Sequence, residues 1–349
     1  MNPYRSRPDH AFWRRGVAAA GHELDPVIDT PWRIGRTDRI ATAGSCFAQH
    51  ISRTLAARGY NYFVAEPAPA DDPAPENYGV FSARFGNIYT ARQLRQLFER
   101  AYGLFRPLDE VWTRPDGRLV DPFRPQIAVG GFASEAEVLA DRRRHLAAVR
   151  TMFEECDVFV FTLGLTEHWA SVRDGAVFPL APGVAGGEAG DAYRFCNFTV
   201  ADIVGDMREF VRRLRVVNPG VKAILTVSPV PLIATYAERH VLVSNTYSKA
   251  ALRAAAQEIV DQDEGVIYFP SYEMITGPHT AGRYFAEDLR SVTPEGVAYV
   301  MDVFGRHLLG ETGSRPAPQV RAAPPTDEQL RAYAAMAELV CDEEALDAP

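Results

Sequence analysis

Cys46 is the residue of this sequence whose setting most favours chemistry. It follows Gly44 and Ser45 at the end of a short strand-like run, and a helical pattern begins at Cys46 itself. The peptide N–H groups at a helix start attract negative charge, which favours the thiolate form of a cysteine. Ser45 offers the hydroxyl alternative, which needs a neighbouring base. The sequence therefore predicts a nucleophile at Cys46 or Ser45, and the alternative is a structural turn of small residues.

A nucleophile of this kind needs a proton acceptor, and the chain has eight histidines. His279 is the first candidate because it lies in a loop nine residues before Asp288, a carboxylate that could orient it. His240 and His168 are the secondary candidates. His50 lies four residues after Cys46 on the same helix face, where we expect it at the surface. We expect the remaining histidines to be structural: His10, His22, His145 and His307.

The composition and charge of the chain argue against several classes of protein. The chain has 349 residues, 23% of them charged, with a formal net charge of -8. This balance argues against nucleic-acid binding. No apolar run reaches the length of a transmembrane helix, and the first residues lack the apolar stretch of a signal peptide. We therefore expect a cytoplasmic protein that binds no nucleic acid, with the oligomeric state left open.

The other cysteines give no metal or disulfide pattern. We expect Cys156 in the core, Cys196 in a loop and Cys341 in a polar tail. Their spacings match no zinc motif, and a cytosol would keep them reduced. The sequence predicts no metal and no organic cofactor.

Strand-like runs alternate with helical patterns along most of the chain, which predicts an α/β fold with a parallel sheet covered on both faces. The list of expected strands is 39–42, 61–64, 157–163, 221–227 and 266–269. The list of expected helices is 46–58, 90–102, 134–153, 200–217, 244–260 and one that Thr293 caps. Segments rich in Pro and Gly at 66–89, 112–133 and 174–198 read as insertions that shape a substrate cleft, the second with a hairpin.

The expected domain organisation has four parts. Residues 1–36 form a lead-in, 37–310 a catalytic domain, 311–325 a linker, and 326–349 a peripheral helix and tail. Ligands of parallel sheets bind beyond the carboxyl ends of the strands. Residues 44–46, 164–168, 228–231 and 270–273 follow such ends, so we expect the site on that edge.

The chain resembles a known family at this point. Gly44-Ser45-Cys46-Phe47-Ala48 spells the motif that names the GSCFA domain family, which is similar to the SGNH/GDSL hydrolases. Supporting segments are 85–90, 163–167, 226–230 and 288–291. The resemblance implies a three-layer α/β/α flavodoxin-like fold and ester hydrolysis or acyl transfer, often on carbohydrate, and hence a small-molecule or glycan substrate.

The resemblance also implies roles for single residues. Cys46 stands at the nucleophile position, with Ser45 one residue away. Gly86 would supply an oxyanion N–H, with Asn87 beside it. In the third block, Gly164-Leu165-Thr166 places Thr166 where the superfamily has Asn. From its own chemistry, the Glu167 carboxylate that follows could position a base or substrate, and the alternative is a solvated loop carboxylate.

The last block departs from the superfamily. Asp288 is present, but Ser291 replaces the expected His, which favours the thiol of Cys46 over the hydroxyl of Ser45 because a thiol needs less activation. The sequence thus predicts an acyl-transfer enzyme, either an esterase or a transferase using a donor such as acyl-CoA. The alternative is a non-catalytic carbohydrate- or polymer-binding protein with a decayed site.

Overall fold

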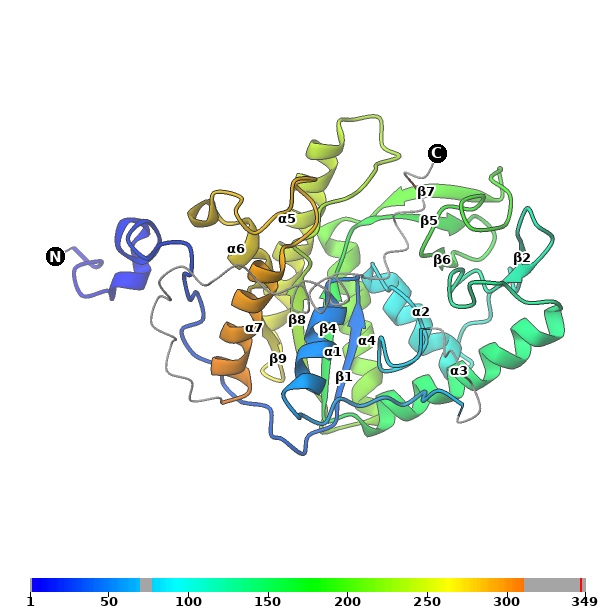
Figure 1. The fold of residues 1–349 in the computed structure, drawn as a ribbon, viewed down its shortest axis with the longest axis horizontal. Coiled ribbons are helices and arrows are strands. Elements are labelled where there is room, and N and C mark those ends of the chain that lie inside the picture. Colours follow the sequence, from blue (N-terminus) through cyan, green and yellow to red (C-terminus); the bar gives the residue numbers. More distant parts are fainter. Residues whose placement is uncertain (1, 70–76, 311–345, 347–349) are drawn as a thin grey trace, which may run out of the picture. The chain divides into compact units, whose positions relative to one another are not determined.

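A computed structural model describes residues 2–69, 77–310 and 346. The chain contacts divide it into two units, drawn in Figure 1. Of the described residues, the larger comprises 35–69, 77–268 and 346, and the smaller comprises 2–34 and 269–310. The predicted linker, nearly all of the predicted C-terminal helix and Cys341 lie outside the described residues.

The larger unit is built on a four-stranded parallel sheet of order β1-β4-β8-β9 (Figure 1). The strands are β1 (Ile40–Gly44), β4 (Val158–Leu163), β8 (Lys222–Val227) and β9 (Val266–Tyr268). β1 and β4 are buried at every position, as expected of a sheet covered on both faces.

Four of the five predicted strands are confirmed, and the one over 61–64 is wrong. Only Tyr62 pairs there, in an isolated parallel bridge with Ile40. The N–H of Ile40 bonds to the Asn61 carbonyl, and the N–H of Phe63 bonds to the Ile40 carbonyl. This bridge extends the sheet beyond β1, so the order remains that of a flavodoxin-like sheet.

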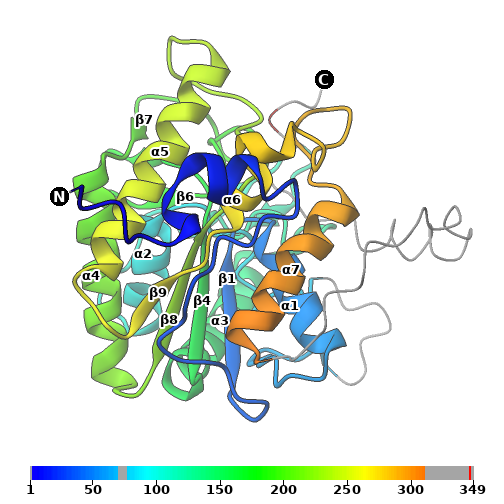
Figure 2. The ribbon, with the colours of Figure 1, turned by 90° about the vertical axis from the view of Figure 1, so that its left-hand side faces the viewer.

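Helices connect these strands and complete the α/β/α fold. They are α1 (Ala48–Ala57), α2 (Ala91–Ala101), α3 (Glu135–Glu155), α4 (Val200–Val217) and α5 (Val241–Val260). α1 packs on β1, α5 packs on β8 and β9, and α4 contacts both α2 and α5 (Figure 2). The side chain of Thr90 caps α2, and that of Thr199 caps α4. None of the described helices has the length and apolar character needed to cross a membrane.

Two insertions carry additional strands. The predicted hairpin is present as β2 (Trp112–Thr113) and β3 (Leu119–Val120). A second, antiparallel sheet has the order β6-β5-β7, from β5 (Glu167–Ser171), β6 (Val177–Phe178) and β7 (Tyr193–Asn197). The loop predicted around Cys196 is therefore wrong. Tyr193 packs at the edge of an aromatic cluster that contains Trp112 and Phe178, and this packing supports the sheet.

The smaller unit joins the N-terminal segment to the last helix. Its elements are η1 (Asp9–Ala11), η2 (Trp13–Ala18), α6 (Ser271–Thr276), η3 (Pro278–Thr280) and α7 (Pro294–Leu308). The hydroxyl of Tyr299 donates to the Leu24 carbonyl, and the N–H of Ile34 donates to the Leu308 carbonyl at 2.7 Å. Thr293 caps α7 as predicted.

Candidate active site

The turn between β1 and α1 has a geometry that requires glycine. Gly44 has φ 140°, and a Cβ there would lie 2.7 Å from the Thr162 nitrogen and closer still to the Thr162 carbonyl oxygen. The N–H of Ser45 donates to that carbonyl at 3.2 Å. The helix proper begins at Ala48, two residues later than predicted, so Cys46 lies in the turn and not within the helix.

Three of the segments singled out in the sequence meet at the carboxyl edge of the sheet. The N–H of Ile88 donates to the Gly44 carbonyl at 2.8 Å, and the N–H of Gly164 donates to the Tyr89 carbonyl at 2.9 Å. A Cβ on Gly164 would lie 3.1 Å from both Ser45 Cβ and Tyr89 Cδ1. Residues 44–46, 85–90 and 163–167 therefore form one contiguous structure.

Two hydrogen-bond donors in this structure are not used by the protein. Within the described residues, the N–H of Gly86 has no acceptor, and Gly86 adopts a left-handed conformation with φ 69°. The hydroxyl of Thr166 is buried and has no partner in the same part of the chain. Gly86 is only half-buried, but a completely buried hydroxyl without a partner, such as that of Thr166, is uncommon and demands an explanation. An oxyanion would accept from both.

Both candidate nucleophiles are buried. Cys46 and Ser45 are each 3% exposed, and Cys46 forms no disulfide within the described residues. The Ser45 hydroxyl has no hydrogen-bond partner within the described residues. The thiol predicted to be reactive is therefore held inside the turn and is not presented openly to solvent.

His168 and Glu167 are part of β5 and are buried. The His168 ring stacks on Phe198 with ring centroids 3.7 Å apart, and its Nδ1 donates to the Thr166 carbonyl at 3.2 Å. Burial lowers the pKa of His168 to about 4. Glu167 accepts a hydrogen bond from the Thr235 hydroxyl at 2.7 Å, so it is not a solvated loop carboxylate.

Two other histidines have local partners. The exposed His240 caps α5, and its Nδ1 accepts from the N–H of Leu242. His50 is 7% exposed, so its predicted surface position is wrong. The His50 ring meets the Phe47 ring edge-on, and burial, followed by the charge of Arg53, lowers its pKa to about 4.

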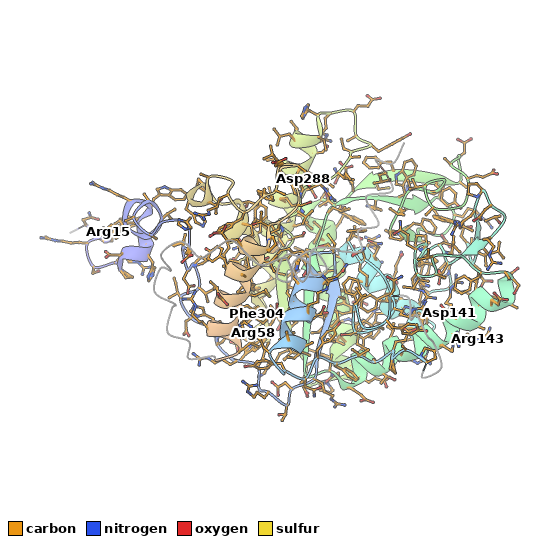
Figure 3. All side chains as sticks on the ribbon, viewed as in Figure 1. Arg15, Arg58, Asp141, Arg143, Asp288 and Phe304 are labelled. Atoms are coloured by element: carbon orange, nitrogen blue, oxygen red, sulfur yellow. The ribbon has the colours of Figure 1, made fainter. Side chains whose placement is uncertain are left out.

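His279 and Asp288 lie in the smaller unit. The carboxylate of Asp288, labelled in Figure 3, accepts from the N–H groups of Arg290 and Ser291 and from the Ser291 hydroxyl. In the described part of this unit, no hydrogen bond joins Asp288 to His279, and His279 Nε2 has no partner. Burial, followed by the charge of His22, lowers the pKa of His279.

The family to which this chain belongs follows from comparing its sequence with models of protein families. A model of the GSCFA family matches residues 39–304. The chain belongs to the GSCFA family. A search of curated proteins gave no match.

Three solved structures are similar to this GSCFA protein. A carbohydrate esterase family 3 enzyme from Talaromyces cellulolyticus is 10% identical, with TM-score 0.37, covering 77% of this chain and 95% of that one. A carbohydrate esterase family 2 enzyme with a carbohydrate-binding domain from Corynascus thermopiles (Myceliophthora fergusii) is 13% identical, with TM-score 0.26, covering 82% and 69%. An acetyl xylan esterase from the rumen bacterium Butyrivibrio proteoclasticus is 12% identical, with TM-score 0.28, covering 79% and 65%. Because these TM-scores lie below 0.5, the function is inferred below from this chain's own residues.

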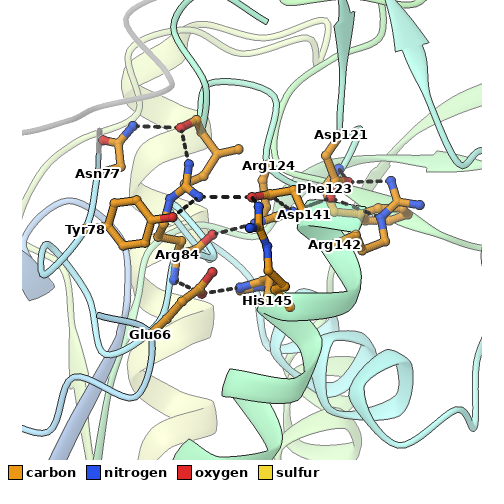
Figure 4. A network of polar contacts seen from close by, with 12 residues as sticks. Glu66, Asn77, Tyr78, Arg84, Asp121, Phe123, Arg124, Asp141, Arg142 and His145 are labelled. Atoms are coloured by element: carbon orange, nitrogen blue, oxygen red, sulfur yellow. Dashed lines mark hydrogen bonds and ion pairs between the residues drawn. The ribbon is translucent and has the colours of Figure 1, made fainter. Parts of the chain in front are cut away.

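A buried polar network supports the segment that carries Gly86 and Asn87 (Figure 4). The side chain of Arg84 donates to Tyr78 and to Asp141, and the backbone N–H of Arg84 donates to the Glu66 carboxylate at 2.7 Å. Arg124 donates to the Arg84 carbonyl and also to Asp141. Backbone and side chain of Arg84 are thus both fixed two residues before Gly86.

Neighbouring charges and hydrogen bonds lower the pKa values of the buried carboxylates Glu66 and Asp121 in this network. Burial alone would raise the pKa of Glu66, but the hydrogen bond and charge of His145 and the N–H of Arg84 bring it down to about 2. Asp121 is completely buried among Arg124, Arg142 and Arg100, and these cations hold its pKa far below its usual range despite burial. A small cavity of about 20 Å³ adjoins the network, lined by residues that include Asn87, Arg100 and His145.

Two residues of α5 reach the same edge and were not anticipated from the sequence. The ammonium of Lys249 donates to the Gly164 carbonyl at 2.7 Å, and the hydroxyl of Ser248 accepts from the N–H of Thr166 at 3.0 Å. The sequence does contain a signal that could have drawn attention to Lys249, because it is one of only two lysines among 37 basic residues. Within the described residues, no group of histidine, cysteine and acidic side chains is arranged to hold a metal ion.

Proposed function

We propose that this GSCFA protein is an acyl-transfer enzyme that cleaves esters through an acyl intermediate on Cys46, with Ser45 as the alternative nucleophile. The observation that carries the proposal is the convergence of the Cys46 turn with two unused donors, the N–H of Gly86 and the hydroxyl of Thr166. Because all these groups lie on segments that hydrogen-bond to one another or pack together, the site is preorganised. Preorganised donors provide much of the transition-state stabilisation in acyl transfer.

The proposed chemistry has two steps. The sulfur of Cys46 attacks the acyl carbon, a C–S bond forms, and the carbonyl electron pair moves to oxygen, where Gly86 and Thr166 donate. The oxyanion then collapses, the ester C–O bond breaks, and the leaving oxygen takes up the proton that the thiol gave up, so that an alcohol departs. Water hydrolyses the thioester to release the acid and restore the thiol. In a transferase, a hydroxyl or amine would replace water, with an acyl donor such as acyl-CoA.

The substrate class follows from the family resemblance. That resemblance favours the ester of a small acyl group with a carbohydrate hydroxyl. His279 remains the sequence-based prediction for the proton acceptor. A thiol depends less on such a base than a hydroxyl does, because part of it is already ionised near neutral pH.

The proposal is tested by the hydrolysis of p-nitrophenyl acetate. We expect turnover by the wild type, loss of turnover in Cys46→Ala, and wild-type turnover in Cys196→Ala, which removes another cysteine of the larger unit. Turnover that survives Cys46→Ala but not Ser45→Ala would move the nucleophile by one residue. Turnover that survives both substitutions would refute the proposed site.

One observation favours a second candidate, a carbohydrate-binding protein with a decayed site. Ser291 stands where the superfamily has its His, and its hydroxyl is bonded to Asp288 at 2.5 Å. A binding protein would retain glycan affinity in Cys46→Ala and show no acyl adduct. Isothermal titration with acetylated and deacetylated oligosaccharides separates the two functions.

A further inference from the structure

Lys249 is a buried cation at the point where the site segments meet. Its side chain is almost fully buried, at 2% exposure, and extends from α5 to the Gly164 carbonyl. Transfer of an ammonium group from water to a protein interior is costly unless polar partners replace the water. The other lysine, Lys222, is only half-buried and lies at the start of β8, the opposite edge of the sheet.

Ser248, which precedes Lys249 on α5, also forms a hydrogen bond to the same turn. The Ser248 hydroxyl accepts from the N–H of Thr166, two residues after the carbonyl that Lys249 holds. The Thr166 carbonyl in turn accepts from the N–H of Phe198 at 3.0 Å. Both ends of the turn over 164–166 are therefore fixed through backbone groups.

This arrangement leaves the Thr166 side chain unused. Its hydroxyl is completely buried and has no partner within the described residues, although the backbone on both sides of it is bonded. On its other side the turn packs against the nucleophile segment, since a Cβ on Gly164 would lie 3.1 Å from Ser45 Cβ. A displacement of the turn would thus move the hydroxyl relative to Cys46.

We propose that Lys249, with Ser248, is a positioning residue that holds the turn over 164–166 so that the Thr166 hydroxyl donates to the oxyanion. This inference rests on the proposed function. Misplacing a catalytic group by about 1 Å costs on the order of 100-fold in rate. We therefore expect Lys249→Met to lower kcat for ester cleavage by about 100-fold while KM changes little.

The first test uses matched variants. Lys249→Met keeps the unbranched chain and removes the charge. Ser248→Ala removes the second hydrogen bond to the turn, and Lys222→Met is the control for the loss of a lysine. We expect Ser248→Ala to lower kcat in the same direction and Lys222→Met to retain it. Wild-type kcat in a folded Lys249→Met protein would overturn the proposal.

A double substitution distinguishes positioning from a general structural role. If Lys249 acts through the Thr166 hydroxyl, Lys249→Met combined with Thr166→Val should be no slower than Thr166→Val alone. Fully multiplicative losses would show that the two residues act independently and would overturn the proposal.

A wild-type protein that cleaves no ester would refute the proposed function without deciding the role of Lys249. In that case, hydrogen exchange of residues 163–168 decides it. Faster exchange in Lys249→Met than in Lys222→Met would support a hold on the turn, and equal exchange would overturn it.

Discussion

The N–H of Ile88 donates to the carbonyl of Gly44 at 2.8 Å, and this bond ties the segment before α2 to the turn that carries Cys46. Ile88 lies two residues after Gly86, whose N–H has no acceptor in the described chain. The proposed donor and the proposed nucleophile therefore lie on two segments joined by a backbone hydrogen bond, and a substitution in one segment should change the position of the other.

Gly44 should tolerate no side chain. We expect Gly44→Ala to destabilise the protein by about 3 kcal/mol or more, because the new Cβ would overlap Thr162 and the backbone φ of 140° is strained for alanine. Urea unfolding measures the change. Gly205→Ala in α4, where the new Cβ meets nothing within 4 Å, is the control and should stabilise by about 0.5–1 kcal/mol. Equal stability of the two variants would contradict this view of the turn.

The Thr166 hydroxyl should matter for rate and not for folding. Thr166→Val preserves the shape and removes the donor, and we expect kcat to fall by about 100- to 1,000-fold with little change in KM. Thr162→Val removes another buried hydroxyl without a partner in the described residues and should keep the activity. A Thr166→Val enzyme with wild-type kcat would exclude this hydroxyl from the oxyanion site.

Asp121 should be essential for stability. Asp121→Asn leaves Arg142 without its buried counter-charge and Arg124 with Asp141 alone, and we expect a loss of about 3–5 kcal/mol in the free energy of unfolding. Asp116→Asn removes a half-exposed carboxylate paired with Arg114 and should cost less than about 1 kcal/mol. Thermal and urea unfolding measure the loss of stability in both variants. Similar losses in the two variants would refute this prediction.

Acid should destabilise the protein through His50. The pKa of His50 is lowered to about 4 by burial and then by Arg53, so the unfolded chain binds a proton that the folded chain does not. Stability therefore falls as pH decreases from about 6.5 to about 4. His50→Gln removes this proton and should reduce the slope over that range, while the buried His168, whose pKa is also lowered to about 4, keeps its own contribution. Urea unfolding at several pH values measures the slope. An unchanged slope in His50→Gln would show that the imidazole is already protonated when folded.

The fold was largely predictable because its strands are strongly marked. The run over 157–163 is apolar at nearly every position, as only a strand buried on both faces can be. The segment over 61–64 has a similar composition but lies at the sheet edge, where one bridge at Tyr62 suffices. The strand around Cys196 was missed because its one partner in the sheet, β5, lies more than a dozen residues earlier in the sequence.

The site was predictable only in part, for a related reason. The glycine motif located the turn, and parallel topology placed residues 44–46 and 164–166 at the same edge. The burial of His50 could not be read from its spacing to Cys46, because spacing gives a shared helix face and not what covers it. Lys249 was missed because its contact with Gly164 spans 85 residues and depends on where α5 packs.

The central claim is that Cys46 forms a covalent acyl intermediate. Its most direct test is intact-protein mass spectrometry after brief exposure to an activated acetyl ester, with wild type, Cys46→Ala and Ser45→Ala compared. We predict one acetyl adduct in wild type and in Ser45→Ala, and none in Cys46→Ala. An adduct that persists in Cys46→Ala and disappears only in Ser45→Ala would contradict the claim.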